Sequence, residues 1–416
     1  MLMPNRVSED SWLLWGAFMV LLMYAGHVLL SFTPFTSTPT VILQLFKLKL
    51  IDFGMSGFTW IVLGFALAFG KSHEDSHFAG SDKFGTHGLK KQGYALWFYA
   101  FSLLTISINI VSNAAASREK SRHWWKHLIT SFLYCCFVFP IIYMWCWSPK
   151  GWASPYRSLK KDHLLAACGV LDTAGSGVVY MSGGVAAYVI LLYYDDKNIS
   201  RRIHSDILNQ SAHKSILHIH QCLALFLTFC GSCGFNGVNN ISIDANMGAM
   251  GGKRMALTTV AAACSFFTMV LYHTFVNFEV HFSNKYTNYI NATISGLIAI
   301  SGSCGTCEFE GAFAIGVVAS IVYITFKHIS KLSHINDKND TTAIYFANGA
   351  WGLIAPGFFA SEDGYKSSIA TFYESNESRL KTCSGGKSLH IIIKSLKLYL
   401  LLTIITKFST EVKVGN

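Results

Sequence analysis

The sequence predicts an all-α membrane protein with eleven transmembrane helices, arranged as two inverted repeats of five helices followed by one more. A low charge content and a series of long apolar runs carry this prediction. Of the 416 residues, 51% are apolar and only 13% are charged, with a mean hydropathy of +0.37, whereas soluble domains carry about 25% charged residues. So few charges cannot cover the surface of a 46 kDa globule in water. The composition therefore excludes disorder, a coiled coil, a small disulfide-bonded domain and an ordinary soluble enzyme.

Eleven apolar runs are long enough to cross a membrane, since a spanning helix needs about 20 mostly apolar residues. They are expected at residues 12–34, 54–70, 94–116, 127–147, 166–194, 214–236, 255–277, 288–304, 311–329, 343–360 and 388–408. The first run follows a polar start without a small-residue cleavage site, so we interpret it as a retained span and not as a signal peptide. No linker rich in Pro, Gly or Ser separates the runs, so residues 1–416 are expected to form one membrane domain.

The net charge of +10 comes largely from the short polar gaps between the apolar runs. This placement favours anionic lipid headgroups as partners, and no nucleic acid is expected. Lys and Arg are almost equally numerous in the loops on the two sides, so the positive-inside rule gives no orientation. The most compact basic cluster, residues 117–126, favours an inner loop after the third span and therefore an N-terminus outside.

The fifth run contains Asp172, the one firm charge that the sequence places inside the bundle apart from two lysines of the last run. Several glycines follow it, and small residues allow helices to approach closely. An aspartate at a helix start caps free backbone N–H groups, so Asp172 is interpreted as a structural cap or as a direct substrate contact, and the two roles are compatible. Tyr180 lies about 12 Å deeper at 1.5 Å per residue, where its hydroxyl needs a partner.

In the tenth run Asn348 is again a polar residue flanked by small ones at mid-span. When the eleven runs are divided into five, five and one, Tyr180 and Asn348 fall in the last span of each half. Matching interruptions in two halves are typical of a transport site in an inverted repeat, and ordinary hydrogen bonds between helices are the alternative. The glycine-rich segment 231–239 around Phe235 indicates either tight helix packing or irregular backbone that lines a cavity.

The chain carries no pattern that indicates catalysis or a cofactor. Two Cys-x-x-Cys motifs, at 230–233 and 304–307, have a spacing associated with zinc, but they lie far apart in sequence at apolar span ends. No phosphate-binding glycine loop, nucleophile elbow or His-Glu-x-x-His motif is present. We therefore expect no enzyme activity, no bound metal and no cofactor.

The string that begins at Asp172 and ends at residue 185 resembles the signature of the ammonium transporter family (Amt/Mep/Rh), closer to its Amt branch. Six further segments match the family in the same order, at residues 12–14, 60–70, 110–118, 140–148, 234–236 and 291–300. The resemblance implies eleven helices, an N-terminus outside and a homotrimer with one pore per subunit, and we expect it in the plasma membrane. It also implies ammonium, ammonia or methylammonium as the substrate and the lipid bilayer as the surroundings.

The family pattern implies an outer site that recruits ammonium. In this sequence Trp147 matches the aromatic wall of that site, where a cation–π contact suits a cation that is losing its water. Asp172 matches the aspartate that supports the site. The family's hydroxyl ligand falls on Asn239, which can still accept a hydrogen bond.

Below the recruiting site the family has a gate of two Phe rings and a narrow pore with two histidines. Phe235 matches one gate ring, and Phe101, with Phe98 as the alternative, matches the other. The two pore histidines fall on Tyr180 and Asn348. A phenol titrates near pH 10 and an amide does not titrate, so neither can relay a proton near neutral pH, although both can hydrogen-bond ammonia or water.

Two functional hypotheses follow from these residues. The first is transmembrane transport of ammonium or ammonia through a pore in each subunit, in which ammonium is recruited at the outer site and ammonia passes without a coupled proton. The alternative is a non-conducting ammonium sensor, or a structural membrane protein of the same fold, which the substituted pore would allow.

Overall fold

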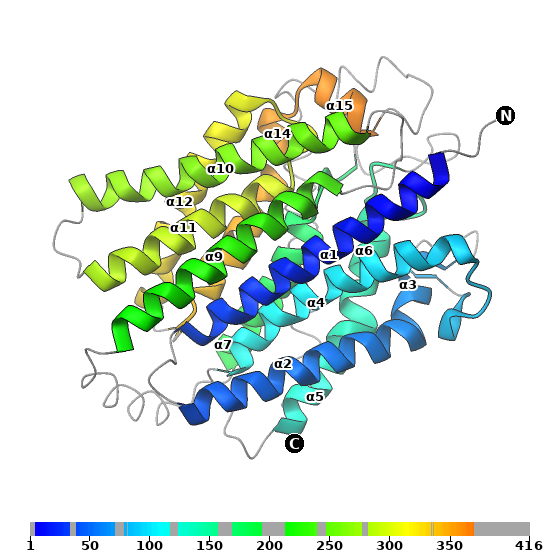
Figure 1. The fold of residues 1–416 in the computed structure, drawn as a ribbon, viewed down its shortest axis with the longest axis horizontal. Helices are drawn as coiled ribbons and strands as arrows, with labels where there is room; N and C mark the ends of the chain where they lie inside the picture. The colour runs from blue at the N-terminus through cyan, green and yellow to red at the C-terminus, as the bar shows by residue number, and fades with distance from the viewer. Residues whose placement is uncertain are drawn as a thin grey trace.

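The computed structural model describes residues 5–33, 39–70, 79–80, 82–116, 124–156, 169–193, 213–238, 247–276, 282–333, 335 and 337–369. Within these ranges the secondary structure is helical, with one isolated bridge between Cys307 and Ala360. The long helices run roughly parallel to one another, so the bundle has two distinct ends (Figure 1). The predicted all-α class is therefore confirmed for the described part of the chain.

The helices of the first half alternate with short π-helical stretches, labelled η2, η6 and η7. They are α1 (Asn5–Phe32), α2 (Pro39–Thr59), η2 (Trp60–Gly64), α3 (Phe65–Phe69), α4 (Tyr94–Ala116), α5 (Trp124–Leu133), η6 (Tyr134–Val138), α6 (Phe139–Trp147), η7 (Ser176–Met181) and α7 (Ser182–Tyr193). Two short 3₁₀ turns, η3 (Phe84–Thr86) and η4 (Lys91–Gly93), precede α4.

The second half has a similar alternation near its end. It consists of α9 (His213–Val238), α10 (Met247–Phe275), α11 (Phe282–Ser301), α12 (Phe309–Leu332), the π-helical η9 (Thr342–Ala347), α13 (Asn348–Ile354), α14 (Pro356–Phe359) and α15 (Glu362–Ile369). Single π-helical turns inside α-helices are rare and frequently mark functional sites. Two of them, η7 and η9, precede the helices that correspond to the last spans of the two predicted halves.

Among the described residues, seven helices are long and apolar enough to cross a membrane. They are Asp10–Phe32, Ile42–Phe69, Tyr94–Ala114, Trp125–Trp147, His218–Val238, Met250–Phe275 and Phe309–Leu332. Each overlaps one predicted span, and the shorter apolar helix Ser176–Leu192 lies at the fifth. The helices α11 and α13 lie at the eighth and tenth, whereas the predicted span 388–408 lies outside the described residues. The count of eleven therefore stays a prediction.

The second span begins earlier than the apolar pattern predicts, at Ile42 and not at residue 54. The charges of Lys49 and Asp52 interrupt the apolar run. The sequence pattern therefore leaves residues 42–53 out of the predicted span. Both side chains are buried and hydrogen-bonded to other helices. Because both side chains find hydrogen-bond partners inside the bundle, the helix continues through the membrane instead of ending at the charges.

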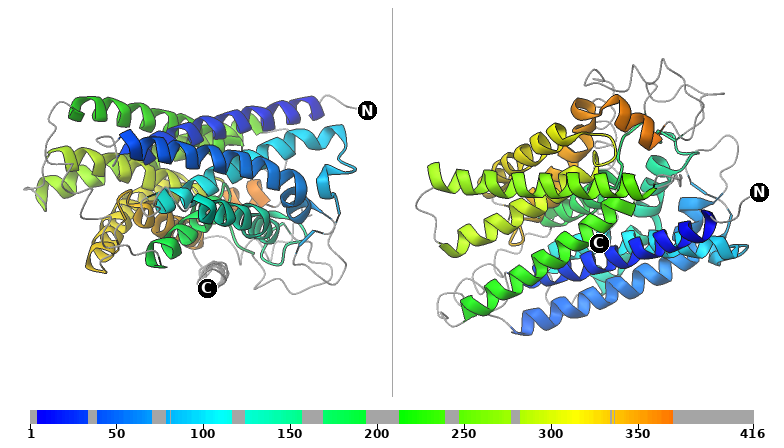
Figure 2. Two further views of the ribbon diagram at one scale, coloured as in Figure 1. Left: turned by 90° about the horizontal axis from the view of Figure 1, so that it is seen from below. Right: turned by 45° about the horizontal axis from the view of Figure 1, so that its top comes forward.

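The helix α1 is central to the packing, because it lies against α9 and α4. The helices α10, α11 and α12 pack against one another, and Figure 2 shows these neighbours from two further directions. Near the centre, η7 contacts both η9 and α13, and α7 contacts η9. A Cβ atom on Gly184 would lie 2.5 Å from the backbone nitrogen of Phe346, so α7 approaches η9 this closely only because residue 184 is glycine.

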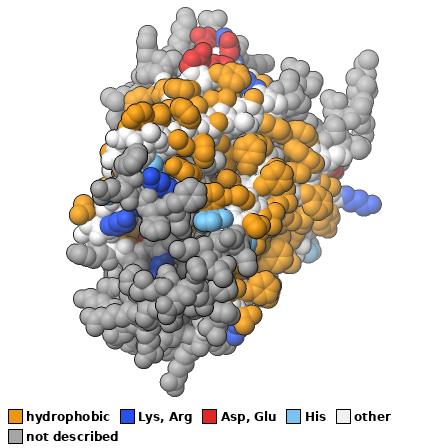
Figure 3. All heavy atoms as spheres, turned by 60° about the vertical axis from the view of Figure 1, so that its left-hand side comes forward, with side chains coloured by type: hydrophobic (Ala, Val, Ile, Leu, Met, Phe, Trp, Pro, Cys, Tyr) orange, Lys and Arg blue, Asp and Glu red, His pale blue; other side chains and the backbone are white. Residues whose placement is uncertain are grey.

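The surface of the bundle is mainly hydrophobic, as a membrane-embedded protein requires. Large apolar side chains point outward from several spans, and Phe18, Leu43, Phe226 and Phe267 are all at least 60% exposed. Figure 3 shows one face on which hydrophobic side chains form a broad band, with Lys, Arg, Asp and Glu mainly at its borders. The chain is therefore an integral membrane protein with several spans.

Candidate functional site

A tight turn before η7 holds the first of the predicted site residues. The carboxylate of Asp172 accepts hydrogen bonds from the backbone N–H groups of Gly175 at 3.1 Å, Gly177 at 3.0 Å and Val178 at 2.9 Å. Gly175 has φ = 102°, a left-handed conformation that glycine adopts without strain. Asp172 thus caps the start of η7, where a helix leaves backbone donors unpaired. Its role as a structural cap is directly visible in these contacts.

The turn is further fixed by the end of α11 and by Trp147. The backbone N–H groups of Thr173 and Ala174 donate to the carbonyls of Gly302 and Ser301, at 3.0 and 2.7 Å. The indole Nε1 of Trp147 donates to the Asp172 carbonyl at 2.7 Å. The structure therefore brings together Trp147 and Asp172, which the sequence assigns to the same outer site.

The Trp147 ring has a defined orientation at this end of the bundle. It lies perpendicular to the Tyr143 ring, with centroids 4.9 Å apart. A Cβ atom placed on Gly175 would lie 3.1 Å from the indole, so the ring lies directly against the capped turn. The third residue predicted for the recruiting site, Asn239, lies outside the described residues.

Deeper in the bundle, Phe235 of α9 and Tyr180 of η7 are neighbours. Their rings are perpendicular with centroids 6.1 Å apart, and both side chains are almost completely buried. The Tyr180 hydroxyl donates to the Sδ atom of Met23 at 3.2 Å, and the Ser232 hydroxyl donates to the same sulfur at 3.2 Å. The hydroxyl that the sequence expects to need a partner at this depth therefore finds a thioether.

Phe101 belongs to a different aromatic group on α2 and α4. It stacks on Trp97 with centroids 5.8 Å apart and meets Phe53 edge to face at 5.7 Å. Phe98, the alternative gate residue, is 6.2 Å from Phe101 and also contacts Phe18. Within the described part of the chain no ring contact joins either residue to the Phe235 ring.

Asn348 begins α13 directly after η9 and is fully buried. Its Nδ2 donates to the carbonyl of Ala343 at 2.9 Å, whereas its Oδ1 has no hydrogen-bond partner among the described residues. The side chain that lies against Tyr180 is Tyr345, one turn earlier, with nearly parallel rings and centroids 6.5 Å apart. The structure therefore pairs Tyr180 with Tyr345, a residue that the sequence reasoning did not single out.

The imidazole of His27, on α1, completes the group at the centre of the bundle. Its Nδ1 shares a 2.8 Å hydrogen bond with the Tyr345 hydroxyl, and its ring centroid is 6.4 Å from that of Tyr180. The sequence reasoning missed His27 as well. An ionisable side chain in the middle of the first apolar run was the signal that could have identified it.

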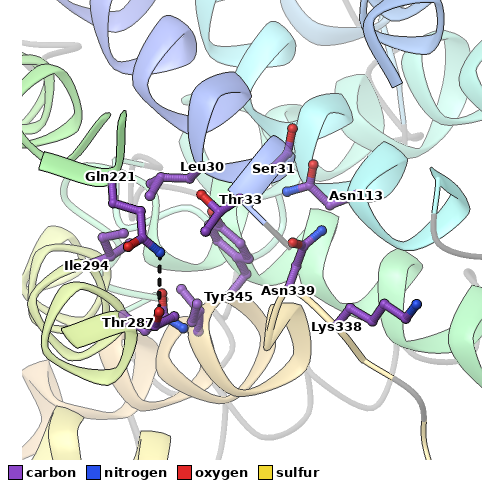
Figure 4. A pocket seen from close by; sticks show the side chains of 12 residues that line it. Leu30, Ser31, Thr33, Asn113, Gln221, Thr287, Ile294, Lys338, Asn339 and Tyr345 are labelled. Atoms are coloured by element: carbon purple, nitrogen blue, oxygen red, sulfur yellow. Dashed lines mark hydrogen bonds between the residues drawn. The ribbon is translucent and has the colours of Figure 1, made fainter. Parts of the chain in front are cut away.

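A narrow polar pocket begins beside Tyr345 and leads toward the end of the bundle opposite Trp147. It has a volume of about 40 Å³, enough for a few water-sized molecules. Gln221 donates to Thr287 across the pocket at 3.2 Å (Figure 4). Its wall consists of Leu30, Ser31, Thr33, Asn113, Gln221, Thr287, Asn291, Ile294, Lys338, Asn339, Ile344 and Tyr345.

A second group of buried charges lies between α2, α4 and α5. The ammonium of Lys49 donates to the Asn109 carbonyl at 3.0 Å and to the side chains of Ser112 at 2.6 Å and Asn113 at 2.5 Å. One turn along α2, Asp52 pairs with His127 at 2.7 Å and accepts a bond from Ser131 at 2.5 Å. The sequence predicted Asp172 as the one firm charge inside the bundle apart from two lysines of the last run. That prediction is wrong, because Lys49 and Asp52 are buried there as well. The hydrogen bonds that Lys49 and Asp52 make to neighbouring helices offset part of the cost of burying their charges.

The fold and these groups define a multi-pass helical membrane protein with polar and aromatic side chains buried inside its bundle. The sequence model of the Ammonium Transporter Family matches residues 11–415, and the chain belongs to that family.

Among curated relatives, ammonium transporter 1 member 1 of Solanum lycopersicum is 30% identical over 323 residues, which cover 75% of this chain and 63% of the relative. The protein of the same name from Arabidopsis thaliana is 28% identical over 323 residues, covering 76% and 62%. The matches thus span slightly less than two thirds of these relatives. They carry the names of transporters and not of enzymes, which supports a non-enzymatic role.

Solved structures agree in fold. One described as "Sensor Amt Protein" has a TM-score of 0.76 at 20% identity and covers 99% of this chain and 95% of that chain. Mep2 of Saccharomyces cerevisiae has a TM-score of 0.73 at 18% identity and covers 98% and 86%. At these identities the likeness shows the shared fold.

Proposed function

We propose that this chain carries ammonium or ammonia across a membrane, recruiting NH₄⁺ at the Trp147 end and passing NH₃ through the interior of the bundle. One observation supports this most directly. The capped turn at Asp172 starts η7, η7 carries Tyr180, and Tyr180 touches Phe235, His27 and Tyr345, of which Tyr345 lines the polar pocket. Family membership supplies the substrate class, because the curated relatives are named as ammonium transporters.

The recruiting step follows from how Trp147 is held. Its indole N–H is engaged by the Asp172 carbonyl, so the ring orientation is fixed and its π-face can attract a cation. The Asp172 carboxylate adds negative charge at the same turn while its oxygens hold the backbone. A cation that enters here exchanges part of its water for the Trp147 ring and the nearby Asp172 carboxylate. This exchange lowers the free-energy cost of its desolvation.

The wider setting of the function is part of the proposal. We assign the protein to the plasma membrane as a homotrimer with one pore per subunit, eleven spans and the N-terminus outside. Phe235 acts as one gate ring, and Phe101, or Phe98 in its place, acts as the other. Asn239 completes the recruiting site.

Uptake of labelled methylammonium by a yeast strain that lacks its own ammonium transporters tests the proposal. Expression of the chain should restore uptake and growth on low ammonium. Trp147→Leu should weaken uptake mainly at low substrate concentration, whereas the matched Trp152→Leu should not, since Trp152 lies beside Trp145 and not on the capped turn. Uptake equal to that of the empty vector, with the protein verified at the cell surface, would exclude transport.

A sensor that binds ammonium without conducting it is the second candidate. The observation that favours it is the nearly complete burial of Tyr180 and Phe235, which are 1% and 0% exposed, so the path is closed at this depth. Purified protein in proteoliposomes separates the two candidates. Ammonium binding without ammonia flux identifies a sensor, whereas flux above that of empty liposomes identifies a transporter.

A further inference from the structure

His27 has an unused hydrogen-bonding atom at the centre of the bundle. The side chain is 1% exposed, and its Nδ1 is engaged by the Tyr345 hydroxyl at 2.8 Å. Its Nε2 is buried and has no hydrogen-bond partner among the described residues. Buried polar atoms are almost always hydrogen-bonded, so an unpaired ring nitrogen indicates a position where a ligand or water binds.

We propose that Nε2 of His27 is the binding site for one molecule of ammonia or a primary amine of similar size, with Tyr345 as its positioning residue. This inference rests on the proposed function and names the side chain that holds the passing molecule. The neighbouring hydroxyls are already engaged, that of Tyr180 by the Met23 sulfur and that of Tyr345 by His27 itself. Among the rings that meet here, the imidazole alone therefore has a free polar atom.

The polar pocket lies close to His27 and shares Tyr345 with it. Leu30 and Ser31, one turn beyond His27 on α1, line the pocket, and Tyr345 lines it too (Figure 4). A volume of about 40 Å³ accommodates molecules of the size of water, ammonia or methylamine. Ligands of this size can therefore reach the neighbourhood of the imidazole from the end of the bundle opposite Trp147.

The hydrogen bond to Tyr345 determines what Nε2 offers to the ligand. When the phenol donates to Nδ1, the ring proton is on Nε2, which then donates to the lone pair of ammonia. When Nδ1–H donates to the phenol oxygen, Nε2 accepts an N–H of the ligand. Ammonia has both a lone pair and N–H groups, so it satisfies Nε2 in either tautomer.

Nuclear magnetic resonance of the full chain in lipid nanodiscs tests the site independently of flux. The protein carries ¹⁵N,¹³C-labelled histidine, and His27→Gln assigns the imidazole signals. Ammonium chloride and methylammonium chloride should shift the His27 signals saturably at constant pH, and sodium chloride should not. Tyr345→Phe should change the Nε2 and Nδ1 shifts before any ligand is added, because it removes the bond that selects the tautomer.

Uptake measurements complete the test, with His220→Gln as the matched control on the neighbouring helix α9. His27→Gln should lower methylammonium uptake about tenfold, and His220→Gln should leave it unchanged. Saturable His27 shifts in a protein without uptake would support the site and overturn transport. Normal uptake by His27→Gln, together with unshifted His27 signals in the natural protein, would overturn the site and leave transport in place. If His27→Gln does not fold, the titration of the natural protein decides alone.

Discussion

Removal of the Asp172 carboxylate should both destabilise the protein and abolish its transport. In Asp172→Ala three backbone N–H groups, those of Gly175, Gly177 and Val178, lose their acceptor at a buried position. Each buried donor left unpaired costs about 1–3 kcal/mol, and loss of a helix cap alone costs about 0.5–2 kcal/mol. Since part of the turn can relax, we expect a loss of about 3 kcal/mol in the free energy of unfolding.

Asp172→Asn refines this expectation, because one carboxylate oxygen serves two donors and the other serves one. An asparagine retains a single acceptor oxygen, which can still bond to Gly177 and Val178, while its amide group faces the N–H of Gly175. We therefore expect a loss of about 1–2 kcal/mol, which is intermediate between that of Ala and none.

Thermal unfolding in detergent, followed by thiol-reactive dye fluorescence, measures the series. Asp172→Ala should lower the midpoint by about 3 °C, Asp172→Asn by less, and the exposed control Asp363→Asn should not change it. Methylammonium uptake should fall in the same order. An Asp172→Ala protein with the unfolding midpoint and the uptake of the natural protein would refute the reasoning. The three hydrogen bonds to the carboxylate would then contribute neither to stability nor to transport.

Three further predictions concern positions outside this turn. Lys49→Met should reduce the free energy of unfolding by about 3–5 kcal/mol, because the buried groups that accept its hydrogen bonds lose their donor. The exposed Lys47→Met is the control, and the unfolding midpoint measures both variants. Gly184→Ala should prevent stable folding, measured as loss of the monodisperse peak in gel filtration, since the added Cβ collides with the η9 backbone. Burial raises the pKa of the Glu308 carboxyl, but the bonds from Lys253 and Ser361 and the charge of Lys253 outweigh it and hold that pKa below its usual range. Stability from the Lys253–Glu308 pair should therefore be present at neutral pH and disappear as the pH falls through the folded pKa, and Glu308→Gln should remove this pH dependence from the unfolding midpoint.

The sequence identified the residues whose contacts are local or follow from a fixed spacing. Asp172 caps donors three to six residues ahead of it, so its cap role is readable from the string alone. Tyr180 follows at a constant distance on the same segment and its ring lies against that of Phe235, whereas the pore and gate roles of the two residues stay predictions.

The residues that the sequence did not reveal depend on contacts between distant helices. The partner of His27 on η9 is 318 positions away, and no local pattern indicates which ring a lone histidine will meet. Tyr345 precedes Asn348 by one turn, and a π-helical stretch changes which residues face the neighbouring helix. Lys49 and Asp52 interrupt the apolar run because they are charged, and local hydropathy does not reveal their hydrogen-bond partners on α4 and α5.

The surroundings of Tyr180 predict that the proposed transport is electroneutral. Its described contacts are Met23, Phe235, His27 and Tyr345, and none of these carries a fixed charge. A cation that leaves water here finds no opposite charge to replace its hydration, which costs far more than the passage of a neutral molecule. The Tyr180 hydroxyl itself does not relay a proton, because it donates to a thioether sulfur that does not take up protons near neutral pH.

An inward ammonium gradient across proteoliposomes tests this prediction. Entering ammonia takes up a proton inside, so an enclosed pH dye should report a rise in luminal pH faster than in empty liposomes. The same gradient applied to a solid-supported membrane should produce no transport current, and Trp147→Leu should slow the pH change without creating a current. A steady inward current that scales with ammonium concentration would contradict electroneutral transport. Such a current requires that NH₄⁺ crosses the Tyr180 region, or that a proton crosses it separately from NH₃.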